Sequence, residues 1–328
     1  MPYQQVSTPR FFINTIEYLD SVGAIDGGID NIYRTLPVDV NLYDSNFLVP
    51  PGSGKLGYSE KHFGAILGHE FGSVDTSEEA SPFYHNTGQP MHTLGGVEFI
   101  ANSYYPIEYS GFSIGLFNLH EWDRVNIGGQ EGTQYNIGSI IIGTYYDMPH
   151  SPDLKLTMSR EYGGTKTIET RGGASLSNSM WTKPPSWGNA GAWELYKGTA
   201  TNQELSRSGR RVWDLSFSYL DDGDLFGANE SLAFDTFKNE IADGKPPTSA
   251  FDDDDLTGNE FNTNILTDYN FYSQVIHKTN GGQLPFIFQP DVNDNTIFAI
   301  CKFDQGSFKF DQVANGFYSC KIRIREAW

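Results

Sequence analysis

Seven histidines are the residues of this chain best suited to acid–base chemistry or zinc binding. They are His62, His69, His85, His92, His120, His150 and His277. A zinc site requires three or four convergent ligands, and no HExxH pattern places two of them on one helix face. Glu70 follows His69 directly, but neighbouring residues of a strand point to opposite faces. The histidines therefore do not predict a metal site.

Two acidic runs have the composition of calcium-binding loops. Residues 221–224 read DDGD, and residues 252–255 read DDDD. Neither run fits the twelve-residue EF-hand spacing, which needs glycine at the sixth position and glutamate at the last. We therefore expect solvated acidic loops, with opportunistic Ca²⁺ binding as the alternative, and no other cofactor.

The stretch PPGSGKLG, residues 50–57, resembles a phosphate-binding loop only superficially. That pattern needs a first glycine where this chain has Val49, and a hydroxyl side chain where it has Leu56. No nucleophile elbow or dinucleotide fingerprint occurs, and the 41 acidic residues give no reason to choose a glycosidase pair. We therefore expect a protein that is not an enzyme.

The composition favours a β-rich chain and argues against nucleic-acid binding. The 328 residues include 35 glycines, 18 tyrosines and 23 phenylalanines, and the formal net charge is -19. Phosphate binding requires clustered lysine and arginine, so we expect no nucleic-acid partner. No apolar run is long enough for a transmembrane helix, and the first residues lack a signal-peptide pattern. We expect no membrane span and synthesis in the cytoplasm.

Strand patterns dominate the first half of the chain. Residues 63–67 form an apolar run that ends at Gly68, and residues 137–143 read IGSIIIG, a β-branched run bounded by glycines. Together with the strand-dense stretch 97–148, they predict a strand-rich unit over residues 1–150. Two prolines, at positions 149 and 152, mark its expected boundary.

The final residues alternate with the period of two that is typical of a half-buried strand. One face carries Tyr318, Cys320, Ile322, Ile324 and Trp328, interrupted only by Glu326. Asn315-Gly316 and residues 304–306 predict the turns that link three antiparallel strands here. Cys301 and Cys320 fall on neighbouring strands, where we expect two reduced core residues.

A helix and a long excursion complete the predicted second half. Residues 264–282 place apolar residues at helical spacing, with Thr267 or Asp268 as the cap and Gly281-Gly282 at the end. Residues 221–262 are rich in acid and turn residues, so we expect a long, partly mobile excursion there. The patterns predict a mainly β protein of two domains, residues 1–150 and 151–328, with one short helix in the second.

Two groups of segments resemble structural proteins of phage tails. The first group resembles the discoidin-like, galactose-binding-type β-sandwich of phage tail proteins. Its segments are KHFGAILGHEFGS and YNIGSIIIGTYYDMP, and the matching residues are Gly68-His69 and the 137–143 run. The second group is similar to the C-terminal domain of tail-tip proteins in the order of its segments. These are RRVWDLSFSYL, a helix ending at Gly282, LPFIFQP, FAICKF and KIRIREAW. These tail-tip proteins comprise the minor tail protein M and the distal tail proteins of long-tailed phages. The two similarities imply two antiparallel, jelly-roll-like β-sandwich domains, residues 1–150 and 151–328. Neither similarity carries a catalytic motif.

The resemblance implies a structural component of the virion tail, made in the host cytoplasm. Such a component would form a homo-oligomeric ring that joins the tail tube to the tip or baseplate. It would contact the tube, hub and fibre proteins and display an outer β-sandwich. Arg323 and Arg325, basic residues on an acidic chain, are the candidate subunit interface.

The alternative function is carbohydrate binding, in a receptor-binding or capsid-decorating protein. A host surface glycan would then dock on an aromatic platform at one end of the first sandwich. The candidate platform residues are Tyr84, Tyr104, Tyr105 and Trp122.

Overall fold

The computed structural model of the chain describes part of its length. The described residues are 7–22, 33–41, 46–48, 61–69, 84–85, 91–93, 98–99, 111–117, 124–126, 134–154, 156–179, 186–187, 190–195, 209–226 and 269–327.

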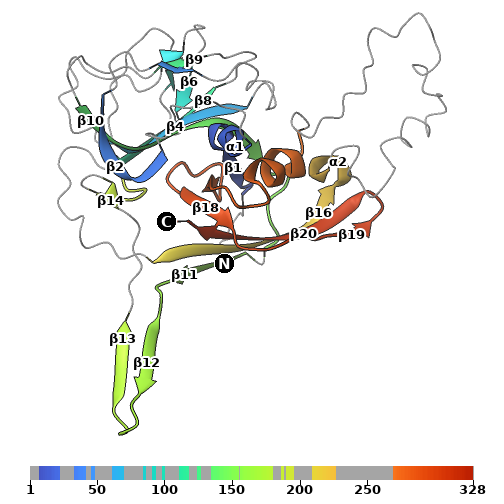
Figure 1. The fold of residues 1–328 in the computed structure, drawn as a ribbon. Helices are drawn as coiled ribbons and strands as arrows, with labels where there is room; N and C mark the ends of the chain where they lie inside the picture. The colour runs from blue at the N-terminus through green and yellow to red at the C-terminus, as the bar shows by residue number, and fades with distance from the viewer. Residues whose placement is uncertain are drawn as a thin grey trace, which may run out of the picture.

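Most of the described structure is one antiparallel sheet of 13 strands (Figure 1). Its order is β11-β16-β20-β18-β17-β1-β10-β4-β8-β6-β7, with β19 paired to β20 and β2 paired to β10. The bounds are β1 (Arg10–Asn14), β2 (Tyr33–Asn41), β4 (His62–His69), β6 (Met91–Thr93), β7 (Glu98–Phe99), β8 (Gly111–Phe117), β10 (Gln134–Asp147), β11 (Thr157–Glu161), β16 (Arg210–Asp221), β17 (Phe286–Gln289), β18 (Ala299–Phe303), β19 (Phe310–Ala314) and β20 (Phe317–Glu326). The predicted mainly β class is confirmed.

Smaller elements surround this sheet. The additional strands are β3 (Asn46–Leu48), β5 (Tyr84–His85), β9 (Arg124–Asn126), β12 (Thr165–Glu169), β13 (Ser175–Ser179), β14 (Ser186–Trp187) and β15 (Ala190–Gly191). The helical segments are α1 (Thr15–Ser21), α2 (Asp222–Leu225), a π-helical turn (Tyr272–Ile276) and a 3-10 turn (His277–Thr279). Within the described residues, the second half therefore contains α2 and the two consecutive helical turns, where one short helix was predicted.

Strand β1 connects the two halves of the chain. It pairs antiparallel with β10 on one side and with β17 on the other. Alternation directs Phe11 into a core formed mainly by the C-terminal strands, and Phe12 into a second core with residues of β4 and β8. One hydrogen-bonded sheet thus continues across the expected boundary near residue 150. The division into two sandwich domains stays a prediction.

The two glycines that bound the IGSIIIG run allow β10 to approach its neighbours closely. A Cβ atom at Gly143 would overlap the Ile13 carbonyl oxygen and lie 2.7 Å from the Thr15 backbone nitrogen. A Cβ atom at Gly138 would lie 2.9 Å from the Leu67 carbonyl oxygen. Both contacts involve backbone atoms, which cannot move aside as a flexible side chain can.

We expect Gly143→Ala to lower the free energy of unfolding by about 1–3 kcal/mol or more, because the added methyl group separates β1 from β10. Urea denaturation at neutral pH measures this loss. Gly306→Ala is the matched control, since a Cβ atom there meets nothing within 4 Å. Equal midpoints for the two variants would contradict this explanation.

The predicted helix starts later than expected. Tyr269 and Asn270 are not helical, and the helical segment runs from Phe271 to Thr279. The Ser273 backbone N–H donates to Asn270 Oδ1 at 2.7 Å, which is the bond of an N-cap. The predicted capping residues, 267 and 268, lie outside the described residues. Gly281 and Gly282 have φ values of 68° and 94°, so the predicted glycine end is confirmed.

A bulge in β16 changes the side to which one predicted core residue points. In residues 208–220, Leu215, Phe217 and Tyr219 alternate with polar residues, a pattern that predicts all three on the buried side. However, the register between β16 and β20 shifts between Phe217 and Leu220. Leu220 consequently takes the buried position, and Tyr219 is 71% exposed.

Candidate functional site on the outer face of strands β16 and β20

The alternation predicted for the last strand is present in β20. Tyr318, Cys320, Ile322 and Ile324 are buried, whereas Lys321 and Arg323 on the opposite side are exposed. Cys301 and Cys320 are both buried and carry free thiols. The side of β20 that faces away from the core, together with the adjoining side of β16 and the edge strand β11, is called the outer face below. It holds both arginines predicted to lie at an interface.

Arg325 is bound to a carboxylate of the edge strand. Its Nε and Nη2 atoms donate to Glu161 Oε2 at 3.0 and 2.7 Å. Glu161 ends β11, and β16 runs between β11 and β20. The ion pair therefore spans three neighbouring strands.

Arg323 lies among three carboxylates. Its Nε atom is 3.1 Å from Asp304 Oδ2 and 3.8 Å from Asp214 Oδ1, and its Nη2 atom is 3.9 Å from Glu161 Oε1. Its side chain is 46% exposed, so water screens these pairs and each contributes little stability. The arginines are held by their own chain, and their role at a subunit interface stays a prediction.

We expect Arg323→Ser with Arg325→Ser to change the free energy of unfolding by less than about 1 kcal/mol, because both pairs are largely solvated. If the arginines contact a neighbouring subunit, the same double variant weakens assembly. Thermal melting and sedimentation velocity on one preparation separate the two effects. A large fall in melting temperature would show that the arginines mainly stabilise the monomer.

The carboxylate that interrupts the apolar stripe has a buried basic partner. Glu326 is 4% exposed, and its Oε1 atom is 2.9 Å from Arg211 Nη2. Glu326 Oε2 also accepts the Arg211 backbone N–H at 2.8 Å, and Arg211 Nη2 donates to the Phe298 carbonyl at 2.7 Å. Sequence reasoning missed Arg211. A lone carboxylate in an apolar stripe was the available signal, because a buried charge requires a partner.

Two of the seven histidines are fully buried in β4. Burial lowers the pKa of His62, and the nearby Lys278 ammonium contributes in the same direction, so that the pKa is about 4. Burial also lowers the pKa of His69 to about 3, partly opposed by a hydrogen bond with the Phe112 backbone. The His69 Nε2 atom lies 2.9 Å from Ser113 Oγ. Both imidazoles are therefore neutral in the folded protein at physiological pH.

A buried lysine lies close to His62. Lys278 in the 3-10 turn has no exposed surface, and its Nζ atom donates to Gln274 Oε1 at 2.7 Å. Burial lowers the pKa of Lys278 to about 7. Half-buried His277 precedes it, exposed His150 lies after β10, and only the backbones of His85 and His92 are described. His120 lies outside the described residues.

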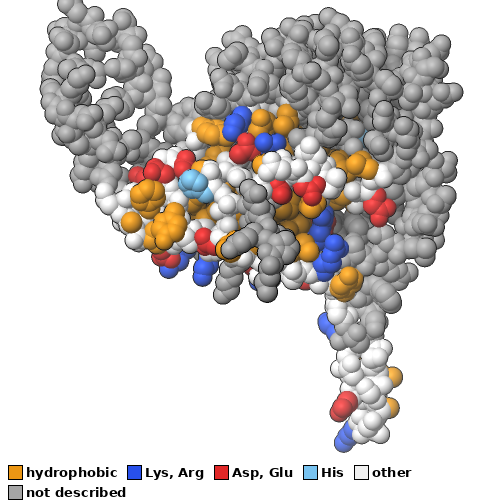
Figure 2. All heavy atoms as spheres, turned by 180° about the vertical axis from the view of Figure 1, so that it is seen from behind, with side chains coloured by type: hydrophobic (Ala, Val, Ile, Leu, Met, Phe, Trp, Pro, Cys, Tyr) orange, Lys and Arg blue, Asp and Glu red, His pale blue; other side chains and the backbone are white. Residues whose placement is uncertain are grey.

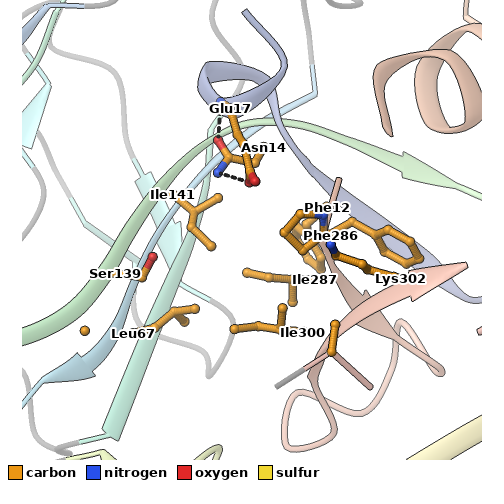
Figure 3. Close-up of a pocket in the computed structure, with 13 residues that line it drawn as sticks. Phe12, Asn14, Glu17, Leu67, Ser139, Ile141, Phe286, Ile287, Ile300 and Lys302 are labelled. Carbon is orange, nitrogen blue, oxygen red and sulfur yellow. Dashed lines mark hydrogen bonds between the residues drawn. The ribbon is translucent and has the colours of Figure 1, made fainter. Parts of the chain in front are cut away.

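An apolar pocket of about 290 Å³ opens where the sheet bends (Figure 3). β1, β4 and β10 contribute Phe12, Leu67 and Ile141, and β17 and β18 contribute Ile287 and Ile300. The polar side chains Asn14, Glu17 and Lys302 also line it, and Asn14 Nδ2 donates to Glu17 Oε2 at 3.3 Å. The pocket is at the lower end of the size range of ligand sites, about 300–1,000 Å³. It can accommodate one small apolar group.

The predicted glycan platform falls almost entirely outside the described residues. Tyr84 belongs to β5, which pairs with β9, and only its backbone is described. Tyr104, Tyr105 and Trp122 lie outside the described residues. The glycan platform therefore stays a prediction.

Of the two acidic runs, only the first is described. Asp221 caps α2 by accepting the Gly223 backbone N–H at 3.1 Å, and Asp222 is buried. Residues 227–262, which include the second run and most of the predicted excursion, lie outside the described part. Over the described ranges, no three His, Cys, Asp or Glu side chains converge as metal ligands. None of the described helices is long and apolar enough to cross a membrane.

Comparison with protein-family models, curated proteins and solved structures finds no match to this chain.

Proposed function

We propose that this chain is a structural subunit of a phage tail, which forms a ring that joins the tail tube to the tip and displays an outer β-sandwich. The resemblance of the C-terminal segments to tail-tip proteins is the reason for proposing a phage tail protein. The observation that carries the assembly part is strand β11, which is an edge of the main sheet among the described strands.

Strand β11 has the features of an edge that another subunit covers. Within the described part of the chain it pairs with β16 on one side only and is the terminal strand of the sheet. Met158 lies opposite the buried Trp213, yet Met158 is exposed, as are Leu154 and Leu156 just before the strand. Edge strands in monomeric proteins are usually short, charged or covered, because unpaired backbone groups beside apolar side chains promote association. A neighbouring subunit would cover this edge.

Sedimentation velocity on the purified chain tests the assembly part of the proposal. We expect one discrete species whose mass is a whole-number multiple of 36.6 kDa, as a closed ring requires. A monomer at all concentrations would contradict a ring-forming subunit. A monomer or trimer that binds an immobilised host glycan would instead support the carbohydrate-binding alternative.

A further inference from the structure

The β12–β13 hairpin extends away from the body of the protein (Figure 1). Among the described strands, β12 and β13 pair only with each other. From Lys166 to Ser177 every residue is exposed except Thr170, which is partly exposed. A two-stranded hairpin without further packing is at best marginally stable in water. Such an extension is expected to gain stability by contact with another surface.

One face of the hairpin carries an apolar pair next to Lys166. Ile168 and Leu176 lie directly opposite each other and are 67% and 62% exposed. The adjacent pair, Thr167 and Ser177, lies on the other face and is polar. Orange side chains are visible along the hairpin in Figure 2. A paired Ile and Leu in full solvent is the type of feature that marks a contact surface.

The hairpin also differs in charge from the rest of the chain. Residues 162–179 contain Lys166 and Arg171 but only one acid, Glu169, so their formal charge is +1. The other 310 residues carry 20 basic and 40 acidic side chains, a formal charge of -20. Two copies, each with a formal charge of -19, repel overall, but the hairpin itself does not add to that repulsion and can contact an acidic surface without like-charge opposition.

An apolar and acidic patch lies at the far end of β16. Tyr219 is 71% exposed because of the bulge, and Phe317 of β20 is 40% exposed. Asp221 lies directly opposite Phe317 in the strand register. We call Tyr219, Asp221 and Phe317 the docking patch.

The patch and the hairpin belong to opposite ends of the same strand. β11, which leads into the hairpin, pairs with Arg210–Asp214 at the start of β16. At about 3.3 Å per residue, the nine residues from Arg210 to Tyr219 span roughly 30 Å. The hairpin extends away from the body, so it can reach this patch on a second copy more readily than on its own.

We propose that the hairpin of one copy docks on the docking patch of a second copy. Ile168 and Leu176 pack on Tyr219 and Phe317, and Lys166 faces Asp221. The two contact surfaces differ, so the contact is heterologous and repeats head to tail until a ring closes. This inference rests on the proposed ring-forming function and names the surfaces that form the ring.

Three double variants of the full-length chain test the inference. The hairpin variant is Ile168→Ser with Leu176→Ser, and the patch variant is Tyr219→Ser with Phe317→Ser. Thr167→Ala with Ser177→Ala is the control, since it alters the opposite face of the same hairpin. Because all six side chains are exposed, thermal melting is expected to change little. Sedimentation velocity then reports the mass of each variant alone and of the hairpin and patch variants mixed in equal amounts.

We expect the wild type and the control to form the ring, and the hairpin and patch variants to be monomers. Their mixture should give a dimer of one copy each, because only one intact hairpin and one intact patch can meet. A ring formed by the hairpin variant, or a mixture that stays monomeric, would overturn the docking inference and leave the ring itself standing. A monomeric wild type would contradict both the inference and the proposed function.

Discussion

Glu326→Ala should lower the free energy of unfolding by about 3–5 kcal/mol, the usual cost of removing one partner of a buried ion pair. The substitution leaves the Arg211 guanidinium beside the Phe298 carbonyl without its carboxylate. It also leaves the Arg211 backbone N–H without its acceptor, the Oε2 atom of Glu326 at the end of β20. Urea denaturation monitored by tryptophan fluorescence measures the loss.

The outer face supplies the matched control for this prediction. Glu161→Ala removes the carboxylate that binds Arg325, but both side chains of that pair are more than a third exposed. We expect Glu161→Ala to cost less than about 1 kcal/mol. Arg211→Met combined with Glu326→Leu should recover most of the lost stability, since an apolar pair of similar volume removes the buried charges together. Equal losses of unfolding free energy for Glu326→Ala and Glu161→Ala would contradict the claim that burial makes the Arg211–Glu326 pair the more important of the two.

Acidification from pH 7 to pH 4 should destabilise the protein through two buried histidines. The pKa of each imidazole in the folded protein lies below the ordinary value of about 6.5, at about 4 for His62 and about 3 for His69. The unfolded chain therefore binds more protons than the folded chain in this range, and stability falls as the pH falls. The stability is fully present above about pH 6.5 and is lost progressively toward pH 4 and pH 3.

The expected loss is on the order of 3 kcal/mol for each histidine by pH 4, since one pKa unit corresponds to about 1.4 kcal/mol. Lys278 adds nothing within this window, because its lowered pKa of about 7 affects stability at higher pH. Free energies of unfolding at pH 7, 6, 5 and 4 give the slope directly. His69→Asn should reduce the slope, because it removes one of the two buried imidazoles. If the free energy of unfolding of the wild type did not change with pH, the two imidazoles would have to become hydrated and protonated while the protein is still folded.

Local patterns predicted the strands well because each pattern reports the burial of its own side chains. The alternation of β20 placed four core residues correctly, and the apolar run 63–67 is the buried centre of β4. The glycines of the IGSIIIG run were noted as boundaries. Their real role depends on Ile13 and Leu67, which are distant in the sequence.

Features that depend on the choice of partner could not be predicted from local patterns. β1 is a short segment whose pairing with both β10 and β17 is determined only by the completed sheet. The exposure of Tyr219 follows from a one-residue bulge, which an alternating pattern does not encode. The basic partner of Glu326 is 115 residues away, and no spacing rule selects it.

Electron microscopy of labelled virions tests the central claim most directly. Gold-conjugated antibodies against this chain, applied to particles purified from the cells that produce it, report where the chain is located. The tail-subunit account predicts label at one end of the tail, where the tube meets the tip, and none on the head. Label on the capsid surface, or particles that carry no label although the chain is expressed, would contradict it.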